Sequence, residues 1–147
     1  GQALLEFAEG DLSYLRYSLG ADVAFALPVR MRLVFETEAG SSVGAPPQKL
    51  WYLGGPLTLR GYSPRAAGGE SFGRGQVEID RSFSFGRLAL FSDMGWAGDG
   101  SDIDLDEALY SAGAGLAVID GILRIDGAWQ LKSPHVFRLD IYLDQLL

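Results

Sequence analysis

Long stretches of alternating apolar and polar residues constrain the fold of this chain more than any other feature. The clearest runs from Tyr14 to Leu27, where every second residue starting at Leu15 is apolar. Successive side chains of a β-strand point to opposite faces, so this period predicts a strand with one apolar face. Similar patterns recur along the chain. We therefore expect an all-β protein of about eight strands, with no amphipathic helix.

The other expected strands carry the same pattern with different strength. It is clear in three further segments: Val29–Glu36, Leu123–Leu131 and Phe137–Asp144. It is weaker in four others: Ala3–Ala8, Gly75–Ser84, Arg87–Trp96 and Ala108–Ile119. Three connections are tight turns, at Leu27-Pro28, Phe85-Gly86 and Asp120-Gly121. Two long loops, at about 39–74 and about 97–107, alternate with these turns. Although two further connections are also short, this arrangement is typical of outer-membrane barrels.

The alternation itself has two interpretations. In a soluble sandwich the apolar face is the core, whereas in a membrane barrel it meets lipid and the polar face lines the lumen. Strands of about 10–14 residues exceed the usual length of ~5–6. Charges of both signs occupy nearly every polar face, and aromatic residues such as Trp96, Trp129, Tyr17 and Tyr110 recur on the apolar faces. These features favour the membrane barrel, with the aromatics as girdle residues.

Composition limits the partners. The 147 residues suffice for one domain, and the formal net charge of −7 with no basic tract argues against nucleic acid. No apolar run approaches the ~20 residues that a transmembrane helix needs. The chain has no cysteine, which excludes disulfide and thiolate chemistry.

The segment "LGGPLTLRGYSPRAAGGE", from Leu53 to Glu70, is too rich in glycine and proline for a strand or a helix. Within it, "LGGPLTLRGY" resembles the signature of the BamA/TamA superfamily of outer-membrane barrels, the bacterial surface antigen family. Further segments resemble the last strands of that family in the family's order: "GQVEIDRSF", "LALFSDMGWAGD", "YSAGAGLAVIDGILRIDGAWQLK" and "VFRLDIYL". The resemblance covers essentially residues 1–147 and corresponds to the C-terminal half of the family barrel.

The resemblance implies a role for the arginine of the loop. In the family, an Arg-Gly-aromatic motif on a long extracellular loop folds into the lumen and pairs with acidic residues on two strands. The matching residues here are Arg60, Glu78 and Asp93. Independently, the alternation places both carboxylates on polar faces, where the planar guanidinium group could bridge them. Gly61 then fits where backbones crowd, and Tyr62 packs beside the bridge.

Other possible sites are weaker. The segment "GDGSDIDLDE" has carboxylates at Asp102, Asp104 and Asp106 that could hold calcium, but Glu107 stands where an EF-hand loop needs glycine. His135 has no serine partner in a recognisable hydrolase arrangement. We therefore expect no catalytic residue, cofactor or metal, and no enzymatic activity.

The resemblance implies an outer-membrane barrel of a Gram-negative-type bacterium that inserts or translocates other outer-membrane or secreted proteins. Alternatives are the pore of a two-partner secretion system, the membrane anchor of an enzyme such as a patatin-like lipase, or a small structural barrel. The expected partners are the lipid bilayer and client polypeptides. Eight strands are half of the family's barrel, so either they close on themselves or two copies join their edges. The ending Gln145-Leu146-Leu147 departs from the aromatic residue usual in the family.

Overall fold

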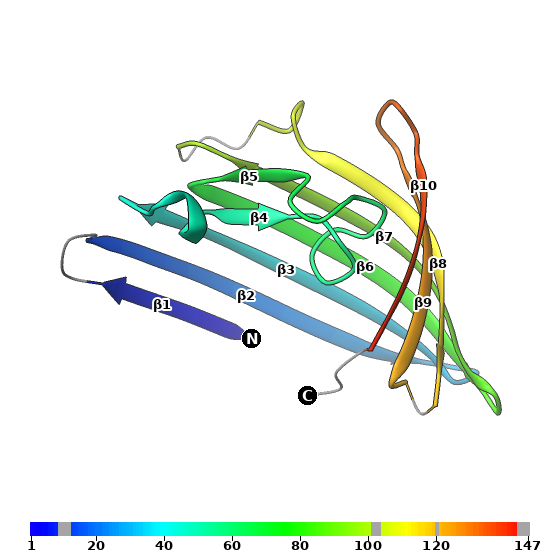
Figure 1. Ribbon diagram of the computed structural model, residues 1–147. Coiled ribbons are helices and arrows are strands. Elements are labelled where there is room, and N and C mark those ends of the chain that lie inside the picture. The colour runs from blue at the N-terminus through cyan, green and yellow to red at the C-terminus, as the bar shows by residue number, and fades with distance from the viewer. Residues whose placement is uncertain (9–12, 101–103, 120, 144–147) are drawn as a thin grey trace.

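The computed structural model describes residues 1–8, 13–100, 104–119 and 121–143. Its main element is an antiparallel sheet of eight strands in which each strand pairs with its neighbours along the chain (Figure 1). The strands are β1 (Gln2–Ala8), β2 (Tyr14–Leu27), β3 (Met31–Val43), β6 (Ser71–Phe83), β7 (Gly86–Gly98), β8 (Leu109–Val118), β9 (Leu123–Gln130) and β10 (Phe137–Leu143). This arrangement confirms the all-β antiparallel fold expected from the alternation.

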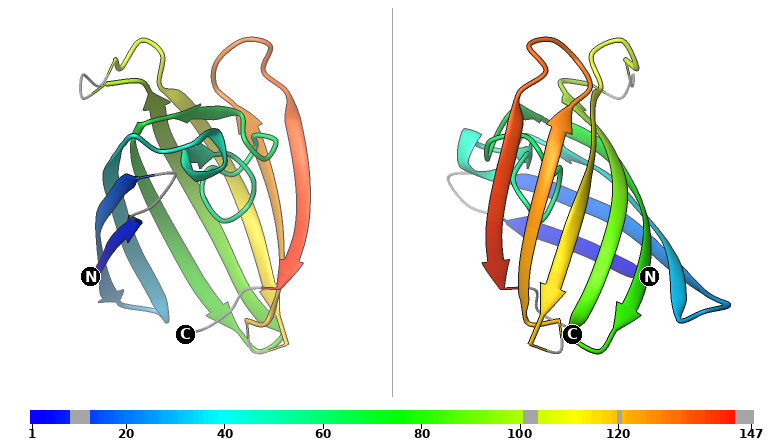
Figure 2. Two further views of the ribbon diagram at one scale, coloured as in Figure 1. Left: turned by 60° about the vertical axis from the view of Figure 1, so that its left-hand side comes forward. Right: turned by 90° about the vertical axis from the view of Figure 1, so that its right-hand side faces the viewer.

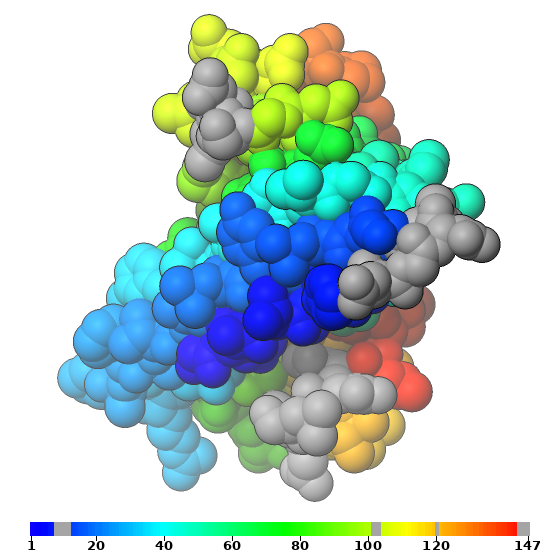
Figure 3. Space-filling model, turned by 90° about the vertical axis from the view of Figure 1, so that its left-hand side faces the viewer, coloured from blue at the N-terminus to red at the C-terminus, as the bar shows by residue number. Residues whose placement is uncertain are grey.

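The sheet curves like the wall of a barrel but does not close. Within the described part of the chain, β1 and β10 are the two edges and each pairs on one side only. The expected alternative in which eight strands close on themselves is therefore not adopted. The β1 edge lies at the surface on its side of the molecule (Figure 3). Both edges leave main-chain groups available for pairing with further strands.

The two faces of the sheet differ as the alternation predicts. Phe25 on β2, Leu90 on β7 and Leu139 on β10 belong to the apolar set and are 50%, 63% and 58% exposed. Antiparallel register keeps such residues on one face, as in the pairs Val23–Phe35 and Leu139–Gly127. The polar set faces the concave side, where the loop between β3 and β6 lies (Figure 2). The described residues include no helix long and apolar enough to cross a membrane.

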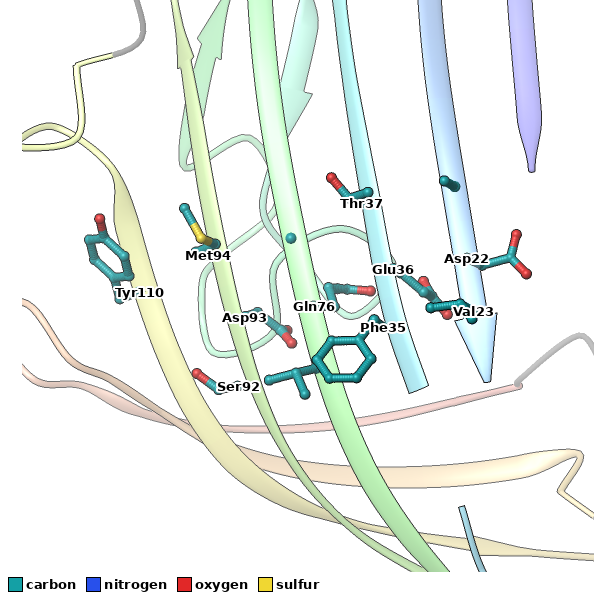
Figure 4. Close-up of a pocket in the computed structure, with 13 residues that line it drawn as sticks. Asp22, Val23, Phe35, Glu36, Thr37, Gln76, Ser92, Asp93, Met94 and Tyr110 are labelled. Atoms are coloured by element: carbon teal, nitrogen blue, oxygen red, sulfur yellow. The ribbon is translucent and has the colours of Figure 1, made fainter. Parts of the chain in front are cut away.

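The outward face has a shallow hollow across its middle strands. Its volume is about 520 Å³. Ala21, Thr37 and Gly75 lie in register across β2, β3 and β6. The larger side chains of Phe35 and Met94 also line the hollow (Figure 4). Most of its lining comes from the outward rows, although Asp22, Glu36, Gln76 and Asp93 of the polar rows also line it.

The aromatic residues of the outward face follow the expected girdle only in part. Trp129 and Tyr17 are 54% and 47% exposed, as girdle residues would be. Trp96 is buried instead, with 5% of its surface exposed. A Cβ atom on Gly98 would come within 2.8 Å of the Trp96 ring, which shows how closely the ring packs on its own strand. The alternation predicted that Trp96 lies in the apolar row of its strand, but it could not predict that its side chain is buried.

The loop between β3 and β6 is shorter than the range of about 39–74 expected for it. β3 continues to Val43 and β6 begins at Ser71, so the connecting segment is 44–70. It contains the short helix η1 (Pro47–Lys49) and a two-stranded sheet of β4 (Trp51–Leu53) and β5 (Ala67–Gly69). The strand ends were missed because their Gly and Ser residues carry no apolar alternation. We refer to segment 44–70 as the inward loop.

A charge on the outward face tests its assignment to lipid. Ile125 lies on β9 in register with Leu116 and Ile141, on the apolar face. We expect Ile125→Arg to destabilise the membrane-inserted protein, because a charge on the lipid-facing surface costs up to about 2–4 kcal/mol, the value at the bilayer midplane. Unfolding by urea in lipid vesicles would measure the change. If the variant unfolds at the same urea concentration as the parent, the outward assignment is wrong.

Candidate functional site: a buried loop arginine

The tip of the inward loop carries Arg60 to the concave wall of the sheet. Its side chain donates to Asp93 through Nε at 2.8 Å and Nη2 at 2.6 Å, and to Glu78 through Nη1 at 2.6 Å. The main-chain N–H of Arg60 also donates to Asp93, at 3.0 Å. Arg60 is 5% exposed and Asp93 is 1% exposed. The structure thus brings together the three charged residues that the sequence singled out.

The sheet supplies the positions of both carboxylates. Asp93 on β7 is paired with Gln76 on β6, and Glu78 is paired with Phe91 two residues further along. The guanidinium carbon of Arg60 lies 3.6 Å from the centre of the Phe91 ring. Phe91 therefore forms the floor between the two carboxylates. A cation over an aromatic face adds a further attraction when it is shielded from water.

Additional charged residues extend the cluster toward β10. Arg124 on β9 donates through Nη1 to Glu78 at 3.1 Å and through Nε to Asp126 at 2.9 Å. Asp126 also accepts from the hydroxyl of Tyr142 at 2.6 Å and lies 3.8 Å from Nη1 of Arg60. We call these six residues the arginine cluster: Arg60, Glu78, Asp93, Arg124, Asp126 and Tyr142. It links the loop to β6, β7, β9 and β10.

Gly61 and Tyr62 complete the contact of the loop tip. Gly61 has φ +86, and a Cβ atom there would lie 3.1 Å from Ala128 Cβ and 3.3 Å from Ser111 Cβ. Both the backbone conformation and the close approach therefore favour glycine. Tyr62 is buried and donates its hydroxyl to the carbonyl of Tyr110 at 3.0 Å. The Gln130 amide donates to the carbonyl of Gly61 at 2.9 Å.

Small residues on β8 make room for the arginine cluster. A Cβ atom on Gly115 would come within 2.1 Å of an Asp126 oxygen, and one on Gly113 within 2.7 Å of the Phe91 ring. Gly113 and Gly115 lie in register with Phe91 and Ala89 of the neighbouring strand. The cluster therefore depends on glycine at both positions of β8, because a larger side chain would overlap with Asp126 at position 115 or with Phe91 at position 113.

The other end of the inward loop is held by β1 and β2. Glu6 on β1 accepts hydrogen bonds from Lys49 Nζ at 2.5 Å, Tyr14 hydroxyl at 2.5 Å and Arg16 Nη1 at 2.9 Å. The Arg16 guanidinium also lies 3.9 Å from the centre of the Trp51 ring. The loop thus contacts the wall near both edges of the sheet: at β1 through Lys49, and toward β10 through the arginine cluster.

The pKa of the loop arginine follows from these contacts. Burial disfavours the charged guanidinium, but hydrogen bonds and charge attraction from Asp93 and Glu78 outweigh it and raise the pKa of Arg60 above its usual range. Arg60 therefore stays charged at every pH at which the fold persists. The arginine cluster contains two guanidinium groups and three carboxylates, so removing Arg60 leaves one cation for three anions.

The sequence did not single out Arg124, Asp126 or Tyr142 as site residues. The alternation did place them on polar faces, which was the one available signal. The residues that meet there depend on the register of β9 against β8 and β10, because Asp126 pairs with Gly115 on one side and Asp140 on the other. Asp102 of the acidic loop and residues 145–147 lie outside the described residues.

A family model matches nearly the whole chain. The Omp85 superfamily domain aligns with residues 4–136, which include the inward loop and the strands that carry its partners. The chain belongs to the Omp85 superfamily. This superfamily comprises outer-membrane proteins of Gram-negative-type bacteria that act broadly in protein assembly and translocation. No curated protein sequence matches the chain.

Proposed function

We propose that this chain forms part of an outer-membrane barrel that inserts or translocates other outer-membrane or secreted polypeptides. The observation that carries the proposal is Arg60, held on an inward loop by Asp93 and Glu78 in a chain of the Omp85 superfamily. The arginine cluster would keep the loop inside the lumen while the wall remains open to a client. No cofactor or metal takes part in the proposed activity.

The open edges provide a mechanism for client engagement. An unpaired strand edge in lipid leaves N–H and C=O groups without partners, at a cost of several kcal/mol for each group. Further strands of the barrel, a second copy of the chain or a client strand could each satisfy these groups. We propose that β10 (Phe137–Leu143) is the edge that accepts a client strand, by the strand addition seen in peptide recognition. Tyr142 lies on this edge strand, and its hydrogen bond to Asp126 would couple the edge to the rest of the arginine cluster.

Cysteine cross-linking tests this proposal, since the chain has no cysteine of its own. Leu139→Cys on β10 is combined with an unfolded outer-membrane barrel precursor that carries one cysteine in its last strand. We expect a disulfide-linked species during assembly in lipid vesicles. The control is Leu90→Cys, which is similarly exposed but lies on β7, a strand paired on both sides. Equal cross-linking at both positions would contradict a role for the β10 edge.

A further inference from the structure

Two arginines at the end of the sheet away from the inward loop have no acidic partner among the described residues. Arg30 lies in the turn between β2 and β3, and Arg81 lies near the end of β6. The N–H of Ser82 donates to the carbonyl of Arg30 at 3.1 Å, and Arg81 is in register with Met31, so the two arginines are neighbours. Both are exposed, and neither forms an ion pair with any residue described in the structure.

Most other arginines of the sheet form ion pairs. On the concave face, carboxylates pair with Arg16, Arg32, Arg74, Arg124 and Arg138. Arg81 instead shares the outward row of β6 with Val77 and Ile79. A charged side chain in that row is tolerated only near the interface, because its cost falls steeply away from the bilayer midplane. Arg81 therefore marks the level at which the apolar surface ends. Asp120 lies outside the described residues.

Aromatic side chains lie at the same level. The guanidinium carbon of Arg81 is 5.1 Å from the centre of the Phe83 ring, and Phe83 stacks on Phe85 with 5.4 Å between ring centres. The two phenylalanines are 37% and 61% exposed. Aromatic rings beside cations are typical of the boundary between hydrocarbon and headgroups. Short turns of outer-membrane barrels face the periplasm, where the adjoining leaflet consists of phospholipid.

The backbone conformation of the β2–β3 turn indicates that its side chains have a function. Val29 and Arg30 have φ +64 and +58. Tight hairpin turns of this conformation favour Asn-Gly, and a β-branched valine there is an outlier. Val29 is nevertheless 65% exposed and packs into no core. An apolar side chain and a cation at two positions with positive φ suit a turn that enters the lipid interface. Backbone strain of this kind often indicates a functional role.

We propose that this turn-side rim, formed by Val29, Arg30, Arg81, Phe83 and Phe85, binds the headgroups of anionic phospholipids. The guanidinium groups contact the phosphate, for which arginine has a suitable planar array of donors. Phe83, Phe85 and Val29 enter the upper acyl region. The inference rests on the proposed outer-membrane location of the chain.

Lipid retention measured by native mass spectrometry tests the proposal. The full chain is placed in nanodiscs that contain equal amounts of phosphatidylglycerol and phosphatidylcholine, and the lipids that stay bound on release are counted. Each basic residue near an anionic surface contributes about 1 kcal/mol, so we expect a preference for phosphatidylglycerol of about fivefold or more. The double variant Arg30→Gln/Arg81→Gln should lose this preference. Arg30→Lys/Arg81→Lys should keep part of it.

Arg65→Gln is the matched control. Arg65 is also exposed, has φ +63 and lies 5.1 Å from an aromatic ring, that of Tyr52, but it belongs to the inward loop. This variant should retain the full preference. The proposal is overturned if the double glutamine variant prefers phosphatidylglycerol as the parent does, or if 10 mM inorganic phosphate displaces the retained lipid. If the chain enters the bilayer but retains both lipids equally, only the proposal that the rim binds anionic headgroups is contradicted. A chain that does not enter contradicts the proposed location as well.

Discussion

Replacing Arg60 by alanine is expected to release the inward loop from the barrel wall before it affects the strands. The substitution leaves Glu78, Asp93 and Asp126 on the concave face with Arg124 as the remaining cation of the arginine cluster. Breaking a buried ion pair by removing one partner costs about 3–5 kcal/mol, and less where water can enter. Because Arg60 belongs to the loop and not to the strand ladder, the loss should appear first as digestion of segment 44–70 by proteinase K.

The matched control for this experiment is Arg138→Ala. Arg138 also pairs with a carboxylate on the concave face, Asp140, but within the described part of the chain it forms no hydrogen bond or ion pair with the inward loop. We expect the loop of this variant to resist digestion as the parent does. The interpretation fails if the loop of Arg60→Ala is digested no faster than that of Arg138→Ala.

Reversing the charges gives a second test of the same contact. Arg60→Glu with Asp93→Arg restores one pair of opposite charges but places a carboxylate at position 60 beside Glu78. We therefore expect the double variant to recover only part of the protection lost in Arg60→Glu alone. Recovery would be incomplete also because the main-chain N–H of residue 60 would lose its acceptor on Asp93. If the double variant is no better protected than Arg60→Glu, the contact between positions 60 and 93 does not hold the loop.

Alternation of apolar and polar residues identifies strands and the faces of their side chains, and this limits how much of the fold could be predicted. Side chains such as Phe25 and Leu139 have a strict period of two, so their strands and faces were predictable from the sequence. The period carries no information where residues are small, and the ends of β3 and β6 were therefore placed inside the expected loop. It also could not decide whether the sheet closes, because closure depends on pairing between distant edges.

The arginine cluster shows the same limit at the level of a site. Arg60, Glu78 and Asp93 could be grouped because a family motif named the arginine and alternation gave the faces of the carboxylates. Arg124 and Asp126 have the same alternation, but so do Arg138 and Asp140 on the next strand. Only the register of four strands determines which of these pairs meets the loop. Pairwise register was not available from a single sequence, whereas the direction of each side chain was.

Replacing Arg124 by alanine is expected to destabilise the protein by a similar amount to Arg60→Ala, about 3–5 kcal/mol. Arg124 is buried and bridges Glu78 and Asp126, and Asp126 in turn holds the hydroxyl of Tyr142 on β10. The damage should therefore reach the edge strand, which Arg60→Ala leaves in place. Faster hydrogen exchange of the β10 amides would report it. Arg32→Ala, which removes a half-exposed partner of Asp80, is the control and should not affect β10.

The double variant Arg60→Ala/Arg124→Ala shows whether the two arginines act as one unit. When Arg60 is lost and the loop is released, water reaches Glu78, and an exposed carboxylate depends less on a second cation. Removing Arg124 from that background should therefore cost less than removing it from the parent. We expect the sum of the single effects to exceed the double effect by about 0.5–3 kcal/mol in urea unfolding. If the effects instead add, each arginine acts alone, and the loop tip is not energetically coupled to the β10 edge.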